Sequence, residues 1–283
     1  MDKSILVFAH MMKTAGTALT KQLIGHYGAK LHLVPGGLKM DDCYYTNKNL
    51  NEDYAKVNRQ LKVITGHPLR PYLDFHIPNA ELRWFTFLRE PTKRYLSHYL
   101  HDYEWSENFR NPRYKSMKDK SIVEWEKIEN YNNYQTKFIA GETNLDKAIE
   151  ILETKMAWVG TANHYDESLL SFKGYFGLQD LCTSGDKINA SLAREEMKKE
   201  TIKKYGDFIS EQNQIDQRLY DYFENHLWPK FKTHKDQVNP AREKPQIIRS
   251  FNTIQFQLIR QLKFSSTQLT YKNVVRFYSR WYR

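Results

Sequence analysis

The 283-residue chain has little cysteine and no long apolar run. Its two cysteines, Cys43 and Cys182, are far apart and form no CxxC motif, so the sequence predicts neither a disulfide framework nor a zinc site. No stretch approaches the roughly 18 apolar residues of a membrane span. The first apolar run, residues 5–9, is shorter than the core of a signal peptide. We therefore expect a cytoplasmic protein with reduced thiols.

Internal repeats and low-complexity tracts are also missing. The composition is 40% hydrophobic and 14% aromatic, which excludes a disordered or collagen-like chain and supports a packed core. Four short apolar runs, each followed by a helix-like pattern, read as buried strands at residues 5–9, 61–65, 84–88 and 156–160. This alternation predicts an α/β fold with a central parallel sheet flanked by helices.

A small-residue turn follows the first predicted strand and leads into a predicted helix at residues 17–27. It contains the sequence KTAGT from Lys13 to Thr17. A strand, a tight turn and a helix N-terminus direct backbone N–H groups and the helix dipole at one point, which favours phosphate or sulfate. A Walker A loop has its lysine after the second glycine, whereas Lys13 precedes Gly16. The turn therefore predicts an anion cradle that is P-loop-like but does not favour ATP or GTP hydrolysis.

Two further motifs stand where other predicted strands end. The third run ends in Arg89, with Ser97 about two turns along the next predicted helix, and the second run leads directly into His67. Ligands of open α/β sheets bind outside the carboxyl ends of the strands. We therefore expect the Lys13 turn, His67 and Arg89 to form one site.

These motifs resemble sulfotransferases that use 3′-phosphoadenosine 5′-phosphosulfate (PAPS). The segment MMKTAGTAL resembles their 5′-phosphosulfate loop, and FLREPTKRYLSHY resembles their 3′-phosphate segment, in which an arginine and a serine eight residues later hold that phosphate. The Gly66-His67 pair before YLDF, the WVGT at residues 158–161 and the loop at residues 185–191 resemble the uronosyl 2-O-sulfotransferases. The resemblance implies that PAPS is the donor and PAP the product, and that the nucleotide contacts Lys13, Thr14, Ala15, Gly16, Thr17, Ala18, Arg89, Ser97, Lys187, Asn189 and Ser191.

The resemblance also implies sulfuryl transfer to a hydroxyl of a carbohydrate or glycoconjugate. In that reaction His67, with an ordinary pKa near 6.5, would act as general base, and Lys13 would stabilise the leaving oxygen. A carboxylate among Asp41, Asp42 and Glu52 is the alternative base, and His10 is expected to pack or orient. No metal cluster is evident in the sequence, and the chemistry requires none.

Two other functions stay open at this stage. A nucleotide-dependent kinase would use the same cradle, although the displaced lysine argues against it. A basic nucleic-acid or membrane-binding module is the other alternative, because the chain carries a net charge of +10. The part before residue 241 is nearly neutral, so we expect no nucleic-acid partner.

The positive charge is concentrated in a C-terminal tail. Residues 241–283 hold nine Lys and Arg against one acid, a local net charge of +8. We place a sulfotransferase domain at residues 1–232 and a linker with a basic, helical extension at 233–283, where prolines and charges interrupt the pattern. From Ile247 the tail places Phe251, Ile254, Leu258 and Leu262 on one helical stripe, with Arg249, Phe256, Arg260 and Lys263 on the opposite face, and residues 274–283 repeat this arrangement. We expect both stripes to pack on the main domain with the charges in solvent. The alternative partners are an anionic membrane at its inner face, an acidic glycan or a second subunit.

Overall fold

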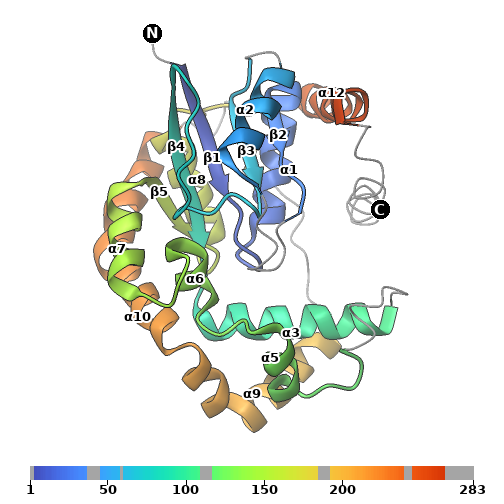
Figure 1. Ribbon diagram of the computed structural model, residues 1–283, viewed down its shortest axis with the longest axis vertical. Helices are drawn as coiled ribbons and strands as arrows, with labels where there is room; N and C mark the ends of the chain where they lie inside the picture. The colour runs from blue at the N-terminus through green and yellow to red at the C-terminus, as the bar shows by residue number, and fades with distance from the viewer. Residues whose placement is uncertain are drawn as a thin grey trace.

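The computed structural model describes residues 3–36, 45–57, 60–108, 117–183, 192–238 and 244–264. At its centre is a parallel sheet of five strands in the order β2-β3-β1-β4-β5 (Figure 1). The strands are β1 (Lys3–Ala9), β2 (Leu31–Leu33), β3 (Val63–Gly66), β4 (Ala80–Leu88) and β5 (Met156–Thr161). The predicted α/β class and parallel sheet are confirmed. All four predicted strands are present, and the three-residue β2 was missed.

The central strands are apolar because both faces of the sheet are covered. Residues 5–9 of β1 and 84–88 of β4 are buried throughout. Parallel strands buried on both faces read as continuous apolar runs rather than as alternating ones. The register pairs Val7 of β1 with Trp84 of β4, and Phe85 of β4 with Trp158 of β5.

The helices divide between the flanks of the sheet and its carboxyl end. In chain order the helical elements are α1 (Gly16–Tyr27), the 3₁₀ turn η1 (Gly28–Lys30), α2 (Asn47–Lys56), α3 (Pro91–Asn108), α5 (Ile122–Glu129), α6 (Tyr134–Ala140), α7 (Leu145–Thr154), α8 (Tyr165–Tyr175), α9 (Leu192–Gln212), α10 (Gln214–Tyr222), the π-helical η2 (Phe223–Leu227), α11 (Trp228–Lys232), η3 (Thr233–Gln237) and α12 (Gln246–Phe264). Figure 1 shows α3, α5 and α9 grouped at the end of the sheet where β1 and β4 finish.

The strand order positions a ligand site between β1 and β4. The chain leaves β1 toward β2 and β3 on one side, and leaves β4 toward β5 on the other. Connections that diverge in this way leave a crevice at the carboxyl ends of the two strands, which is where open α/β sheets bind ligands. The predicted cradle follows β1 and Arg89 follows β4, so both lie at this crevice.

The C-terminal helix α12 packs opposite to our expectation. Its apolar residues Phe251, Ile254 and Leu258 are exposed, while Phe256, which we placed on the solvent side with the charges, is only 8% exposed. The helix packs on α1 and η1 through that opposite face, at the end of α1 that is remote from the cradle (Figure 1). The prediction that the first stripe packs on the main domain is wrong, because polar side chains such as Asn252 donate to backbone carbonyl oxygens at the end of α1. The second predicted stripe, within residues 274–283, lies outside the described residues.

The first residues of the predicted linker pack against the main domain. Residues 233–237 form η3, which packs closely on α8: a Cβ on Gly174 would lie 1.9 Å from the carbonyl oxygen of His234. Within the described residues, no helix is long and apolar enough to cross a bilayer.

Candidate active site

The turn between β1 and α1 has an unusual backbone. Lys13 and Ala15 both adopt left-handed conformations, with φ of 66° and 65°. Residues other than glycine pay on the order of 1–2 kcal/mol for this region, so the surrounding structure must impose it. Among the described residues, no backbone carbonyl accepts a hydrogen bond from the N–H groups of residues 14–17. A turn of this kind, at a helix N-terminus, gathers N–H donors around one point and favours an anion there.

Gly16 is required at the start of α1 because His10 packs against it. A Cβ at this position would lie 2.0 Å from Cδ2 of the His10 ring. His10 is buried and stacks on Phe8, with 5.2 Å between the ring centroids. The sequence predicted a packing or orienting role for His10, and the contacts of its ring and carbonyl fit that role.

Within the cradle, the hydroxyl of Thr14 is engaged inside the turn. Its side chain is buried, and its hydroxyl donates to the carbonyl oxygen of Met11 at 3.1 Å. Because this bond uses the only hydroxyl proton, a contact from Thr14 to an anion would come from its backbone N–H. Lys13, Ala15, Thr17 and Ala18 are partly exposed at the turn.

His67 follows β3 and lies beside His10. Its Nδ1 is 2.6 Å from the carbonyl oxygen of His10, and the two rings are 4.3 Å apart. A carbonyl only accepts, so Nδ1 carries the proton and Nε2 keeps its lone pair. The backbone of the cradle strand thereby fixes the tautomer that a general base needs.

The pKa of His67 differs from the ordinary value that we assumed. Burial, together with the positive charge of Arg70, lowers it to about 4, against the opposing effect of the bond to His10. Arg70 is itself fully buried and lies over the ring of Phe138 at 4.2 Å. The imidazole is therefore neutral and able to accept a proton throughout the physiological range, but it is a weaker base than a free histidine.

Arg89 joins the second motif to the first. Its Nη1 donates to the carbonyl oxygen of Lys13 at 3.0 Å, so the guanidinium reaches the cradle turn from the end of β4. The sequence predicted this convergence, and the described residues bring Lys13, His67 and Arg89 to one edge of the sheet. Arg89 is partly exposed, and the planar fork of a guanidinium suits the oxygens of a phosphate.

The backbone of Arg89 is held by a glutamine that sequence reasoning missed. The Arg89 N–H donates to Oε1 of Gln135 at 2.9 Å, and Nε2 of Gln135 donates back to the Arg89 carbonyl at 2.8 Å. The buried carboxylate of Asp216 in turn accepts from the backbone N–H groups of Gln135 and Thr136. Gln135 lies 46 residues from Arg89, and no local pattern signals the pairing.

Ser97 lies on α3, the helix that starts directly after Arg89. The carboxylate of Glu90 accepts from the N–H groups of Thr92 and Lys93 and so caps the helix. Ser97 is partly exposed. The charge of Lys13 is among those that lower the pKa of the adjacent His98, although burial is the largest cause. The Lys13 side chain therefore lies within electrostatic range of α3 close to Ser97.

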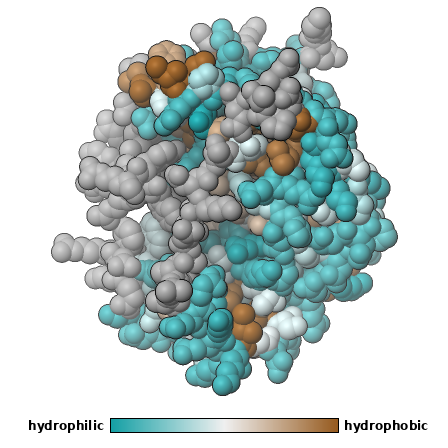
Figure 2. All heavy atoms as spheres, turned by 180° about the vertical axis from the view of Figure 1, so that it is seen from behind, coloured by the Kyte–Doolittle hydropathy of each residue, from teal (hydrophilic) through white to brown (hydrophobic). Residues whose placement is uncertain are grey.

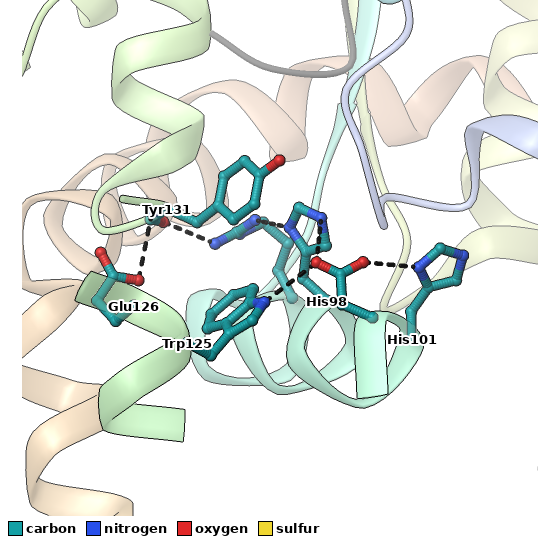
Figure 3. A network of polar contacts seen from close by, with 7 residues as sticks. His98, His101, Trp125, Glu126 and Tyr131 are labelled. Carbon is teal, nitrogen blue, oxygen red and sulfur yellow. Dashed lines mark hydrogen bonds and ion pairs between the residues drawn. The ribbon is translucent and has the colours of Figure 1, made fainter. Parts of the chain in front are cut away.

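A buried polar network supports α3 beneath the site (Figure 3). Asp102 accepts from the indole of Trp125 at 3.1 Å and lies 3.1 Å from Nδ1 of His101 and 3.9 Å from His98. Burial opposes ionisation, but the charge of His98 and these hydrogen bonds lower the pKa of Asp102 to about 2. The network fixes the helix that carries Ser97 without using Ser97 itself.

The remaining predicted residues belong to the late loop and to the alternative base. Lys187, Asn189 and Ser191 of the late loop, and Asp41 and Asp42 of the alternative base, lie outside the described residues. The third carboxylate, Glu52, is exposed on α2. Over the described parts of the chain, no group of three or more His, Cys, Asp or Glu is placed to hold a metal ion.

No protein-family model matches this chain, and no curated protein is similar enough to be matched.

Proposed function

We propose that the protein is a PAPS-dependent sulfotransferase that transfers a sulfuryl group to a hydroxyl of a carbohydrate or glycoconjugate. The observation that carries the proposal is the bond from Arg89 Nη1 to the Lys13 carbonyl at 3.0 Å. It brings two motifs that are 76 residues apart to one crevice, next to a histidine whose tautomer is fixed for proton transfer. This combination fits in-line displacement on an activated sulfate, with an arginine to hold a distal phosphate.

The donor groups suit a nucleotide with phosphates at both ends. The N–H groups of residues 14–17 and the Lys13 ammonium would bind the phosphosulfate end, and Arg89 with Ser97 would bind the 3′-phosphate. Glu90, the carboxylate nearest in sequence to Arg89, is engaged in capping α3. When bound, PAPS supplies the activated sulfuryl group.

Each residue of the site has one task in the transfer. His67 Nε2 accepts the proton of the acceptor hydroxyl as its oxygen attacks sulfur, while the bond from Nδ1 to His10 keeps the ring oriented. Lys13 and the N–H groups of the turn stabilise the negative charge on the oxygen that leaves with the nucleotide. The bond from the acceptor oxygen to sulfur forms as the bond from sulfur to the leaving phosphate oxygen breaks.

Thermal stabilisation by adenosine 3′,5′-bisphosphate (PAP), compared with ATP and 5′-AMP, tests the donor site. A ligand at 100 times its dissociation constant stabilises the folded state by about 2.7 kcal/mol. We expect PAP to raise the melting temperature selectively, and Arg89→Ala to abolish the shift. Arg218→Ala, at an exposed position on α10, is the charge-matched control and should keep it. Selective stabilisation by ATP would instead favour the nucleotide kinase, and no shift with PAP would refute the sulfotransferase.

A further inference from the structure

The C-terminal helix α12 presents an apolar stripe to the outside. We define the outer stripe as Ile247, Phe251, Ile254 and Leu258, which are 79%, 64%, 55% and 53% exposed. Their spacing of four, three and four residues places all four on one side of the helix. Figure 2 shows apolar side chains gathered over this part of the molecule.

The opposite face of α12 holds the helix in this orientation. Asn252 Nδ2 donates to the carbonyl oxygens of Gly25 and His26 at 2.8 and 3.1 Å, and Arg249 Nη1 lies 2.6 Å from Sγ of Cys182. Gly28, with φ of +53°, allows a close approach, since a Cβ there would lie 3.1 Å from the Asn252 carbonyl oxygen. Turning the stripe inward would break these contacts, so the apolar side chains are held toward the outside.

The surroundings of the outer stripe are positively charged. The 19 residues of α12 include Arg249, Arg260 and Lys263 but no aspartate or glutamate. A hollow beside the helix is lined by Lys30, Lys62 and Lys244, together with His26, Tyr27, Ile248, Asn252 and Gln255. Lys30 and Lys62 are exposed, and within the described residues neither forms an ion pair.

Asp180, which pairs with two residues that line this hollow, is already engaged. Asp180 lies 3.3 Å from Lys244 Nζ and 3.6 Å from His26 Nδ1. Burial, and then the charge of Lys244, lowers the pKa of His26 to about 4, so this histidine is neutral at physiological pH. The free positive charge of the hollow therefore comes from Lys30 and Lys62.

These features favour an anionic lipid surface as the partner. Two copies meeting through this face would bring like charges together, and four side chains are few beside the 20–30 residues that each partner contributes to a stable protein interface. A helix with an apolar stripe and basic flanks suits the boundary between headgroups and acyl chains. We propose that α12 lies in the surface of an anionic membrane, with the outer stripe among the acyl chains and Lys30 and Lys62 at the headgroup phosphates.

This orientation leaves the candidate active site accessible. The helix contacts the end of α1, whereas the cradle is at its start, and 12 helical residues span about 18 Å. Membrane binding would thus localise the enzyme without covering the crevice between β1 and β4.

Vesicle flotation of the full chain tests the proposal. We expect the protein to float with phosphatidylcholine vesicles containing about one third phosphatidylglycerol, and to remain unbound with phosphatidylcholine alone. The variant Phe251→Ser/Ile254→Ser should lower the partition coefficient roughly tenfold or more. The matched control Ile128→Ser/Ile202→Ser replaces apolar residues that are 47% and 45% exposed elsewhere, and it should bind like the wild type. Lys30→Gln/Lys62→Gln should weaken binding about fivefold per lysine.

Three results would overturn the proposal: failure of the wild type to float, equal binding by the stripe variant, or equal binding to neutral vesicles. A dimer in light scattering that the stripe variant abolishes, without flotation, would assign the stripe to a second copy. Circular dichroism and the PAP-dependent melting shift verify that each variant is folded. Because α12 is remote from the cradle, the sulfotransferase proposal and the membrane proposal can fail separately.

Discussion

Replacing Gln135 by methionine tests how the end of β4 is held. The side chain is 1% exposed and makes two hydrogen bonds, at 2.9 and 2.8 Å, to the backbone of Arg89. Methionine has a similar volume but can make neither bond. Each neutral bond contributes about 1 kcal/mol, and leaving its partner unsatisfied adds to the cost, so we expect a loss of about 2–4 kcal/mol. For a chain of this size that corresponds to a melting temperature lower by about 4–8 °C.

Thermal unfolding measures the change in stability. Calorimetry measures PAP binding, at a temperature well below the melting temperature of the variant. The Gln135→Met variant should bind PAP about tenfold less tightly, because the backbone of Arg89 is no longer held and its guanidinium is less precisely positioned. Gln217→Met is the matched control: that side chain donates to Asp221 at the surface at 2.8 Å, and its loss should cost under about 0.5 kcal/mol. If the two variants have the same melting temperature and bind PAP with the same affinity, the inferred support of Arg89 by Gln135 is refuted.

The remaining predictions concern the histidines and the cradle. His67→Ala should lower kcat for sulfuryl transfer by about 10²–10⁴ while PAP still stabilises the protein, and unchanged turnover would assign the base elsewhere. The pH profile of kcat/KM should stay flat from pH 8 to about 5 and fall through pH 4, where His67 gains its proton; an acid limb near 6.5 would contradict the lowered pKa. Burial also lowers the pKa of His10 and His98 well below 6.5, so below about pH 6.5 these histidines bind more protons in the unfolded than in the folded state. The free energy of unfolding should therefore rise with pH from pH 5 toward neutrality, and urea unfolding at pH 5 and 7.5 measures this. Gly16→Ala should lower the free energy of unfolding by about 1–3 kcal/mol in the same assay, because the added Cβ would overlap the ring of His10. A urea midpoint equal to that of the wild type would show that the ring can move aside without cost.

The fold class could be predicted because it depends on local patterns. Continuous apolar runs such as residues 84–88 mark strands that are buried on both faces, and their alternation with helical segments implies a parallel sheet. The three-residue β2 was missed because LHL is too short to show a period, and it becomes a strand through pairing with β3. The order of the strands in the sheet could not be predicted either, since no local pattern indicates which strands pair.

The candidate site divides in the same way. The cradle, His67 and Arg89 were predictable because each follows a strand, and parallel strands deliver their carboxyl ends to one edge. The support of Arg89 by Gln135 and Asp216 was not, because those contacts join residues 46 and 81 positions apart. The pKa of His67 was assumed to be ordinary, and its lowering comes from burial and from Arg70.

The sequence by itself determined the apolar runs, the turn with Lys13, the charge of the tail and the amphipathic period of α12. Tertiary structure alone decided which way that helix faces. A helical period states that a stripe exists but not what covers it, and here hydrogen bonds from Asn252 to the end of α1 hold the polar face inward. Tertiary structure likewise decided that Nδ1 of His67 meets the His10 carbonyl, because contacts between distant segments exist only once the sheet has formed.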